Sequence, residues 1–250
     1  MVIDHALRAR ISDALTEALR PLPTVLAGWE GGSAAFQNLD AYSDIDLAYL
    51  VADDASLDDL YERAEAALEA VSPIVARYTP QLGRYYALKD ASEFLLVDLV
   101  FLRVGEPDHH LEVERHGETL VLFDKGHWLR RVPLDDVRLA QGRDARLLEL
   151  QTWFPMSQVF VRKAILRGQG VEAVHAYWAC TLKPLADLLR MRYCPARWDF
   201  GVRYLDRDLP ADVYAQVQEL ALVTDLEDLE RKRVQAATWA TALLEELISE

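Results

Sequence analysis

The sequence has only two cysteines, Cys180 and Cys194, and they are not spaced as a CxxC-type pair. Such sparse cysteine usage argues against zinc ligation by this pair and is typical of a reducing, cytoplasmic compartment. No apolar run reaches the roughly 18 residues that a membrane span requires. The first residues lack the basic start and apolar stretch of a signal peptide. We therefore expect a cytoplasmic protein that does not span a membrane.

Two common enzyme signatures are also missing. No GxxxxGK[ST] segment occurs, which excludes a P-loop, and no Ser/His/Asp nucleophile motif has supporting context. Positive charge is scarce, because 27 Lys and Arg residues against 41 Asp and Glu residues give a formal net charge of −14. Neutralising a nucleic-acid backbone takes many Lys and Arg contacts, so a long nucleic-acid partner is disfavoured. A cationic small molecule would be attracted, although solubility is the commoner reason for such a charge.

The two halves of the chain differ in pattern. Residues 1–130 mix helical and strand signals, with predicted helices at 3–20 and 57–71 and predicted strands at 24–29, 44–51, 93–103 and 120–123. Residues 144–250 are almost wholly helical in pattern, with predicted helices at 144–167, 171–193, 211–223 and 226–248. A kink is expected at Pro184. The charged segment 130–143 contains Pro133 and is the predicted linker. We predict an α/β domain at 1–130 and an all-α bundle at 144–250.

An acidic pair, Asp44 and Asp46, lies on the second predicted strand. Side chains alternate along a strand, so both carboxylates project from one face, with their Cα atoms about 6.6 Å apart. Two like charges this close repel each other, and a divalent cation would relieve the repulsion. Magnesium prefers a few carboxylates together with phosphate oxygens. The pair therefore predicts a magnesium site suited to a triphosphate.

Two further features support this prediction. Asp98 is surrounded in sequence by apolar residues, in Phe94-Leu95-Leu96-Val97-Asp98-Leu99-Val100-Phe101-Leu102. A buried carboxylate is costly unless a cation or a proton pairs with it, so Asp98 is the predicted third acid. Gly32 and Ser33 form a turn ahead of the acidic pair. There the backbone could approach a phosphate closely, and the seryl hydroxyl and the following amides could bind its oxygens.

The stretch Gly31-Gly32-Ser33-Ala34-Ala35-Phe36, Asp40 and Ser43-Asp44-Ile45-Asp46-Leu47 resembles the signature of the polymerase-beta-like nucleotidyltransferase superfamily. Segments after residue 144, such as Tyr204-Leu205 and Asp208-Leu209-Pro210, look like the helical domain of aminoglycoside nucleotidyltransferases. The resemblance implies an α+β fold, with an N-terminal mixed sheet flanked by helices and a C-terminal all-α bundle. Two departures are Gly31, where an apolar residue is usual, and the absence of a glycine from the spacer, which has Gln37-Asn38 instead.

The resemblance implies transfer of a nucleotidyl group, adenylyl above all, from ATP or another nucleoside triphosphate to a hydroxyl. Asp44 and Asp46 would hold Mg²⁺, with two ions expected, and Gly32 and Ser33 would bind the triphosphate. Asp98 would be a third metal ligand or the general base, with Glu93 as the alternative base. Arg203 is the first candidate cation for the pyrophosphate, ahead of Lys183 and Arg162.

The acceptor stays open at this stage. A small, cationic molecule such as an aminoglycoside, bound in a cleft between the domains, is the leading hypothesis. The alternatives are a protein-modifying nucleotidyltransferase, as in antitoxin or stress systems, and a non-catalytic nucleotide-binding domain. The sequence predicts no oligomeric state.

Overall fold

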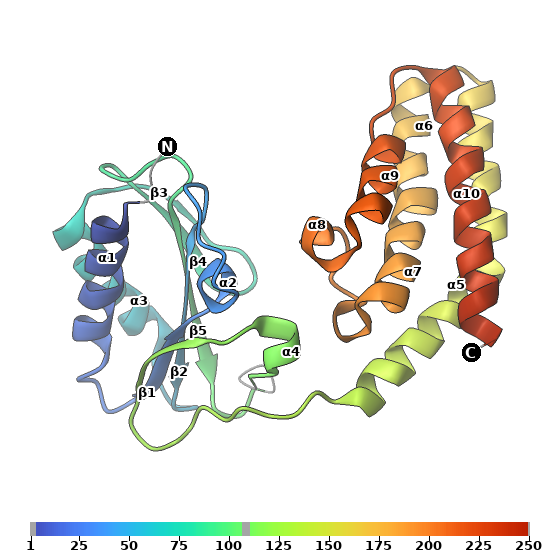
Figure 1. The fold of residues 1–250 in the computed structure, drawn as a ribbon. Helices are drawn as coiled ribbons and strands as arrows, with labels where there is room; N and C mark the ends of the chain where they lie inside the picture. The colour runs from blue at the N-terminus through green and yellow to red at the C-terminus, as the bar shows by residue number, and fades with distance from the viewer. Residues whose placement is uncertain (1–3, 107–110, 250) are drawn as a thin grey trace. The chain divides into compact units, whose positions relative to one another are not determined.

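The computed structural model describes residues 4–106 and 111–249. The chain divides into two compact units, Met1–Leu134 and Asp135–Glu250 (Figure 1). None of the helices in the described part of the chain is both long and apolar enough to cross a membrane.

The first unit is built around a six-stranded mixed sheet, which agrees with the predicted α+β fold. Its strands are β1 (Val25–Glu30), β2 (Ile45–Val51), β3 (Ile74–Tyr78), β4 (Arg84–Leu88), β5 (Leu96–Arg103) and β6 (Leu120–Asp124). Its helices are α1 (His5–Leu19), α2 (Gly32–Ala35), α3 (Leu57–Val71) and α4 (Val113–His116). The strand order is β3-β4-β5-β2-β1-β6. Only β2 and β5 pair in parallel, and the other neighbours are antiparallel.

Helices α1 and α3 cover one face of this sheet, as Figure 1 shows. Their apolar residues recur at helical spacing, and in α1 Leu7, Ile11, Leu15 and Leu19 are all buried. Helix α3 begins where the Ser56 hydroxyl accepts a hydrogen bond from the backbone N–H of Asp59, which satisfies one of the free donors of the first turn. The opposite face carries a smaller apolar cluster around Trp29, Leu50 and Leu102.

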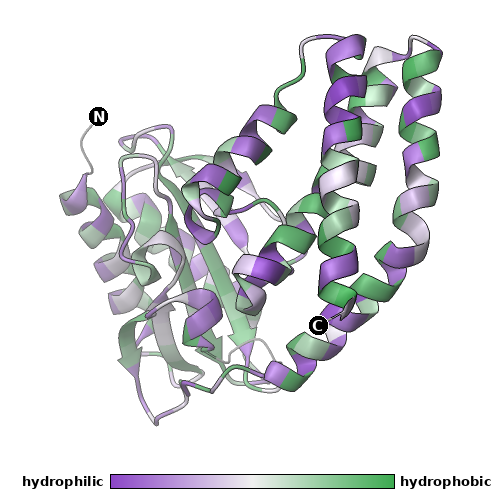
Figure 2. Ribbon diagram, turned by 45° about the vertical axis from the view of Figure 1, so that its right-hand side comes forward, coloured by the Kyte–Doolittle hydropathy of each residue, from purple (hydrophilic) through white to green (hydrophobic). Residues whose placement is uncertain are grey.

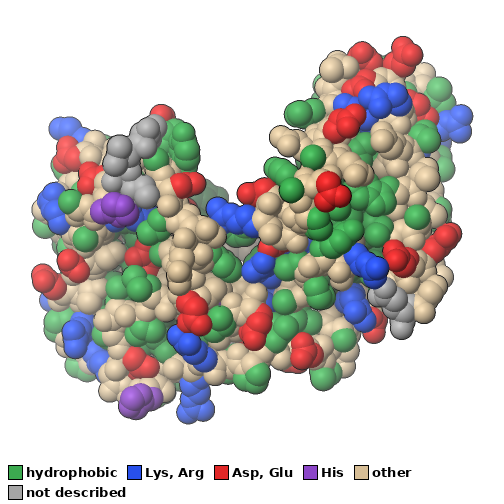
Figure 3. Space-filling model, in the orientation of Figure 1, with side chains coloured by type: hydrophobic (Ala, Val, Ile, Leu, Met, Phe, Trp, Pro, Cys, Tyr) green, Lys and Arg blue, Asp and Glu red, His purple; other side chains and the backbone are tan. Residues whose placement is uncertain are grey.

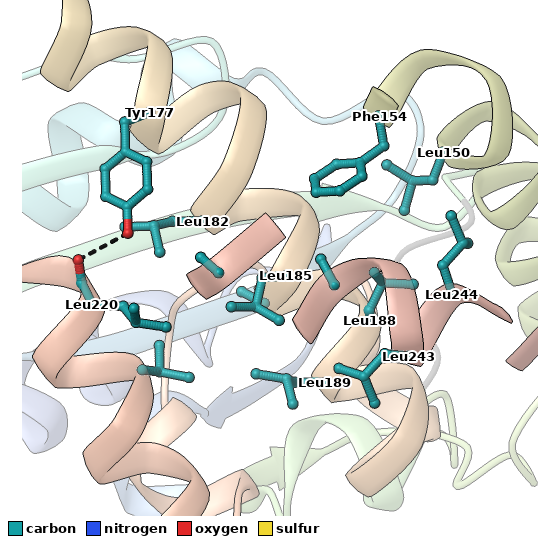
Figure 4. Close-up of a cluster of buried hydrophobic side chains, with 14 of the residues drawn as sticks. Leu150, Phe154, Tyr177, Leu182, Leu185, Leu188, Leu189, Leu220, Leu243 and Leu244 are labelled. Atoms are coloured by element: carbon teal, nitrogen blue, oxygen red, sulfur yellow. Dashed lines mark hydrogen bonds between the residues drawn. The ribbon is translucent and has the colours of Figure 1, made fainter. Parts of the chain in front are cut away.

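The second unit consists of helices, as predicted. They are α5 (Asp136–Leu166), α6 (Gly170–Tyr177), η2 (Trp178–Leu182), α7 (Lys183–Tyr193), η3 (Pro195–Arg197), α8 (Leu205–Asp208), α9 (Ala211–Ala221) and α10 (Leu226–Ser249). Hydrophobic and hydrophilic residues share each long helix, so that an apolar stripe can face inward (Figure 2). The core gathers leucines from α5, α7 and α10, and the Tyr177 hydroxyl reaches into it to donate a hydrogen bond to the Leu220 carbonyl, 3.0 Å away (Figure 4).

The first helix of this unit begins earlier than the sequence pattern predicts. Residues 130–143 were expected to form a linker, but α5 starts at Asp136. The Asp135 carboxylate caps the helix by accepting a hydrogen bond of 2.9 Å from the backbone N–H of Arg138. A charged first turn is compatible with a helix once such a cap is present, so charge density alone was a misleading linker signal.

The predicted kink at Pro184 is replaced by one wide turn. The five residues of η2 form a π-helical turn, and Pro184 follows within the first turn of α7. Proline has no N–H to donate to the carbonyl four residues earlier. That carbonyl belongs to Cys180, and it accepts a hydrogen bond from the Gln158 side chain at 2.9 Å instead. The missing backbone donor is therefore replaced from helix α5.

A buried ion pair fixes the chain between α7 and α9. Arg190 is fully buried and pairs with Asp208, which also pairs with Arg197. The same guanidinium donates to the backbone carbonyls of Gly201 and Arg203. One side chain thus holds the irregular segment 197–208 in place.

We expect Asp208→Asn to lower the free energy of unfolding of the second unit by about 3 kcal/mol, because it leaves the Arg190 charge buried without a counter-ion. Urea unfolding followed by circular dichroism measures the loss. The matched control is Asp206→Asn, two residues away, whose carboxylate is 54% exposed and pairs only loosely with Arg207, at 3.9 Å. It should change stability by less than about 0.5 kcal/mol. Equal losses in the two variants would contradict this role for Arg190.

Candidate active site

Three adjacent strands bring three polar side chains into one row. Asp46 on β2 is the register partner of Asp98 on the parallel strand β5, and Tyr85 on antiparallel β4 is the partner of Asp98 on its other side. Residues directly opposite each other project from the same face of a sheet. All three side chains are half-buried. The row lies on the face opposite α1 and α3, since Val100 and Ala48, two residues further along these strands, pack in the cluster of that face.

Asp98 is less enclosed than its apolar sequence suggests. Its chain neighbours Val97 and Leu99 are completely buried because they face α1 and α3, whereas Asp98 itself is only half-buried. The carboxylate is therefore only partly desolvated. It still lies in register beside Asp46 of β2.

Tyr85 was not anticipated from the sequence. The pKa of the Tyr85 phenol is raised, and the largest cause is its hydrogen-bonding interaction with the neighbouring Asp98 carboxylate, which favours the protonated phenol. Burial adds to this increase in pKa, and so do the negative charges of Asp98, Asp46 and Asp44. All three predicted acids therefore act on one phenol group. The turn signals around Pro80 and Gly83, between two short tyrosine-containing segments, could have indicated the β3–β4 hairpin that carries it.

Asp44 lies one residue before β2, in a loop that closes on itself. The Ser43 hydroxyl donates to the Asp40 carboxylate at 2.9 Å, and the backbone N–H of Tyr42 donates to the same carboxylate oxygen at 2.9 Å. The Tyr42 ring also packs edge-on against Phe94, with 5.0 Å between the ring centroids. These local bonds hold the approach to Asp44, although that residue is outside the strand on which it was predicted.

A buried arginine joins this loop to the end of β1. Arg8 on α1 donates one hydrogen bond to the Ser43 carbonyl and another to the Glu30 carboxylate, each 2.9 Å long. Both charged residues are buried, with 7% and 8% of their surfaces exposed. Burial is the largest influence on Glu30 and raises its pKa, while the Arg8 charge acts against the increase. Ser43 precedes Asp44, and Glu30 precedes the glycine turn, so Arg8 ties together the two segments that frame the acidic pair.

The glycine turn lies directly against Asp46. Gly32 has a φ of +54°, a conformation that favours glycine, and a Cβ atom at this position would overlap the Asp46 carboxylate. The backbone N–H of Gly31 donates to the Asp46 carbonyl at 2.9 Å, which fixes the turn beside β2. The Ser33 hydroxyl oxygen is buried and has no hydrogen-bond partner among the described residues. A buried hydroxyl without a hydrogen-bond partner destabilises the fold by about 1–3 kcal/mol. A ligand oxygen that accepts a hydrogen bond from the Ser33 hydroxyl would therefore be favoured there.

The donor set fits a divalent cation in its chemistry, because Asp44, Asp46 and Asp98 supply the oxygen ligands that magnesium prefers. Over residues 4–106 and 111–249, no three His, Cys, Asp or Glu side chains are grouped so that they could hold a metal ion. The three acids thus share one region of the sheet without converging on a point. Rotation of their side chains toward a common cation would relieve their mutual repulsion.

The remaining predicted residues are not members of this row of side chains. Glu93 is exposed, ahead of β5. Arg203 belongs to the second unit, where it donates to the Tyr204 hydroxyl at 3.0 Å and packs over the Tyr204 ring. Lys183 pairs with Asp187 at 3.2 Å, and Arg162 is exposed. A contact of any of these cations with a triphosphate stays a prediction.

No protein-family model matches the chain, and no curated protein matches it. Among solved structures it is similar to spectinomycin adenyltransferase of Enterococcus faecialis, solved with ATP and spectinomycin (12% identity, 97% of each chain covered, TM-score 0.37). It is also similar to aminoglycoside 6-adenyltransferase of Bacillus subtilis (14% identity, 96% of this chain and 88% of that chain, TM-score 0.32). A third similar structure is the CdnE cyclic dinucleotide synthase of Elizabethkingia meningoseptica, solved with GTP and Apcpp (12% identity, 98% of this chain and 90% of that chain, TM-score 0.33). These proteins are nucleotidyltransferases, the class that the Gly31–Leu47 motif resembles. At such identities and TM-scores, the assignment of a reaction to this chain rests on its own residues.

Proposed function

We propose that the first unit transfers a nucleotidyl group from a nucleoside triphosphate to a hydroxyl group of a small acceptor and releases pyrophosphate. The observation that carries the proposal is the row of Asp46, Asp98 and Tyr85 beside the turn that contains Gly32 and Ser33. Carboxylates that could bind magnesium here adjoin a turn whose buried Ser33 hydroxyl could bind a phosphate oxygen, and magnesium-dependent phosphate chemistry uses both kinds of group.

The reaction breaks a phosphoanhydride bond of the nucleoside triphosphate and forms a phosphoester bond to the acceptor. The acceptor oxygen forms a bond to the α-phosphorus, the bond from the α-phosphorus to the bridging oxygen breaks, and pyrophosphate carries away the electron pair. Gly32 lets the turn lie against Asp46, and the Ser33 hydroxyl beside it donates a hydrogen bond to a phosphate oxygen. Mg²⁺, when bound by Asp44 and Asp46, would neutralise charge on the triphosphate. Asp98 takes the acceptor's proton or completes the ligand set of the metal.

The two roles of Asp98 make different predictions for Asp98→Asn. If Asp98 is the base, turnover falls while the Mg²⁺ concentration needed for half-maximal rate stays the same. If it is a ligand, that concentration rises. Titrating MgCl₂ at saturating nucleotide for wild type and variant separates the two roles.

For the donor and acceptor we propose ATP and a small cationic molecule such as an aminoglycoside. The resemblance of the Gly31–Leu47 motif supports the adenylyl group. The net charge of −14 supports a cationic acceptor, because charge complementarity raises its local concentration. Basic and acidic side chains are interspersed on the face drawn in Figure 3. We therefore propose that a cationic acceptor is attracted by the carboxylates of the site rather than by this face as a whole.

The direct test is pyrophosphate release from each of the four nucleoside triphosphates, with and without a panel of aminoglycosides, in MgCl₂ and again in EDTA. We expect release with ATP to need both Mg²⁺ and an acceptor. Incubation of the protein with a cell lysate and labelled ATP gives the complementary result. Labelled small products agree with the proposal, and labelled protein bands would indicate a protein-modifying enzyme instead. Absence of any turnover would favour a non-catalytic nucleotide-binding domain.

Removal of the Tyr85 hydroxyl tests whether this tyrosine, which lies beside Asp98, contributes to turnover. We expect Tyr85→Phe to lower kcat about 10- to 100-fold, because a hydrogen bond to a charged group contributes about 1.5–3 kcal/mol. KM for the nucleotide should change little, since the phenol orients Asp98 rather than the triphosphate. The control is Tyr78→Phe, which removes an exposed hydroxyl from the ring stacked against Tyr85. A kcat loss of the same size in Tyr78→Phe would contradict the specific role of Tyr85.

A further inference from the structure

The second unit contains a cavity of about 180 Å³ formed by four of its own segments. These are the π-helical turn Trp178–Leu182, helix α7 through Ala186, the stretch 202–206 and helix α9. An apolar cavity of about 150 Å³ is enough to bind benzene in a protein interior. The cavity is therefore large enough for one six-membered ring with a short substituent.

Apolar side chains line the cavity and also stand exposed at its mouth. Leu182 and Leu205 are buried, with 3% and 5% of their surfaces exposed, whereas Trp178 is 39% exposed and Val202 is 53% exposed. Scattered single apolar residues on a surface need no explanation, but exposed ones that adjoin a cavity are typical of ligand sites. A ring entering between Trp178 and Val202 would remove apolar surface from water at both residues.

Two of the segments that line the cavity, the π-helical turn and the stretch 202–206, are held in place by their backbone geometry and by Arg190. The π-helical turn sets the position of Trp178, and turns of this kind are frequent at functional sites. The stretch 202–206 follows Gly201, which has a φ of +60°, and includes Tyr204, which has a φ of +58°. The Arg190 guanidinium donates hydrogen bonds to the backbone carbonyls of Gly201 and Arg203. These bonds hold the stretch 202–206 in place and keep it from filling the cavity.

Polar groups at the cavity favour a positively charged ligand. The Asp206 carboxylate and the Gln218 amide line the cavity and are solvent-exposed. The nearest cation to Asp206 is Arg207, at 3.9 Å, and such an exposed, distant pair binds its carboxylate only weakly. Trp178 and Tyr214 also present aromatic rings, whose faces attract an ammonium group.

We propose that this cavity binds a small molecule that combines one apolar ring with one ammonium group. The ring occupies the space above Leu182, and the ammonium group pairs with Asp206. The inference goes beyond the proposed nucleotidyl transfer and does not depend on it, because every residue that it uses belongs to the second unit.

Benzylammonium is the probe, with benzyl alcohol and benzoate as ligands of the same ring size but neutral or negative charge. Binding to the full chain is measured by isothermal titration calorimetry without nucleotide or Mg²⁺, so that failure of the proposed reaction cannot affect the result. We expect saturable 1:1 binding of benzylammonium, roughly tenfold weaker binding of benzyl alcohol and none of benzoate at the same concentration. No saturable binding of benzylammonium, or equal binding of benzoate, would overturn the proposal.

Three variants locate the site. Val202→Trp fills the mouth of the cavity from an exposed position and should abolish binding of both benzylammonium and benzyl alcohol. Asp206→Asn should weaken benzylammonium about tenfold and leave benzyl alcohol unchanged. Asp212→Asn removes a carboxylate from the first turn of α9, outside the cavity, and should leave both affinities as in the wild type. A loss in Asp212→Asn equal to that in Asp206→Asn would show that only overall charge matters and would refute the site.

Discussion

Asp46→Asn is expected to reduce Mg²⁺-dependent nucleotide turnover by roughly 10³-fold or more, since it removes a ligand charge at the point where phosphate charge must be neutralised. The asparagine side chain has the same shape as aspartate. It therefore fits the narrow space beneath Gly32, where even a Cβ atom on the glycine would overlap the residue at 46. The measurement is the initial rate of pyrophosphate release at saturating ATP and acceptor.

The same substitution should not weaken the fold. Asp46 stands beside Asp98, and their mutual repulsion is removed when one becomes neutral, so the thermal midpoint without Mg²⁺ should stay the same or rise. Addition of Mg²⁺ and ATP should raise the midpoint of the wild type and not that of the variant, because only the wild type binds the ion at this position. Asp13→Asn, an exposed change on α1, is the matched control for loss of one carboxylate. A variant that turns over normally would show that the site is assigned to the wrong residues.

The strand positions of Asp46 and Asp98 were predictable because strand signals are local properties of the sequence. The strand pattern of residues 44–51 and the apolar run of residues 93–103 were sufficient to place Asp46 and Asp98 on strands, and the structure pairs them in register. The depth of Asp98 was not predictable in the same way. An apolar run indicates that both faces of a strand are packed against other elements. It does not indicate at which residue of the strand one face becomes exposed to solvent.

Features that depend on pairing between distant segments were missed. Strand β3 is largely exposed, so it lacks the alternation that marks a half-buried strand, and the β3–β4 hairpin that carries Tyr85 was not predicted. The start of α5 was misplaced because its charged first turn resembles a linker until the cap from Asp135 is known. Arg8 gives no sequence signal, because nothing in a helix pattern shows that one of its arginines lies buried against Glu30, 22 residues away.

Arg8→Met is expected to lower the free energy of unfolding of the first unit by about 3–5 kcal/mol, because it leaves Glu30 buried without a partner. Urea unfolding would measure this loss. Turnover would also fall, but that result alone could not separate a damaged fold from a displaced loop. The second substitution Glu30→Leu, made in the same chain, removes the orphaned carboxylate. Replacing a buried pair by apolar residues of similar volume is often neutral, so Arg8→Met/Glu30→Leu should recover most of the lost stability.

The double variant then isolates the contact with the loop. It regains stability but still lacks the 2.9 Å hydrogen bond from Arg8 to the Ser43 carbonyl, which adjoins Asp44. If that bond positions Asp44, kcat stays at least about tenfold below the wild type while the unfolding curve returns to normal, since loss of a hydrogen bond from a charged group removes about 1.5–3 kcal/mol. The Mg²⁺ concentration for half-maximal rate should rise as well, a change that a purely structural role would not produce. Full recovery of kcat together with stability would mean that Arg8 serves the fold alone, and that the loop carrying Asp44 is held by the Asp40–Ser43 turn without help from α1.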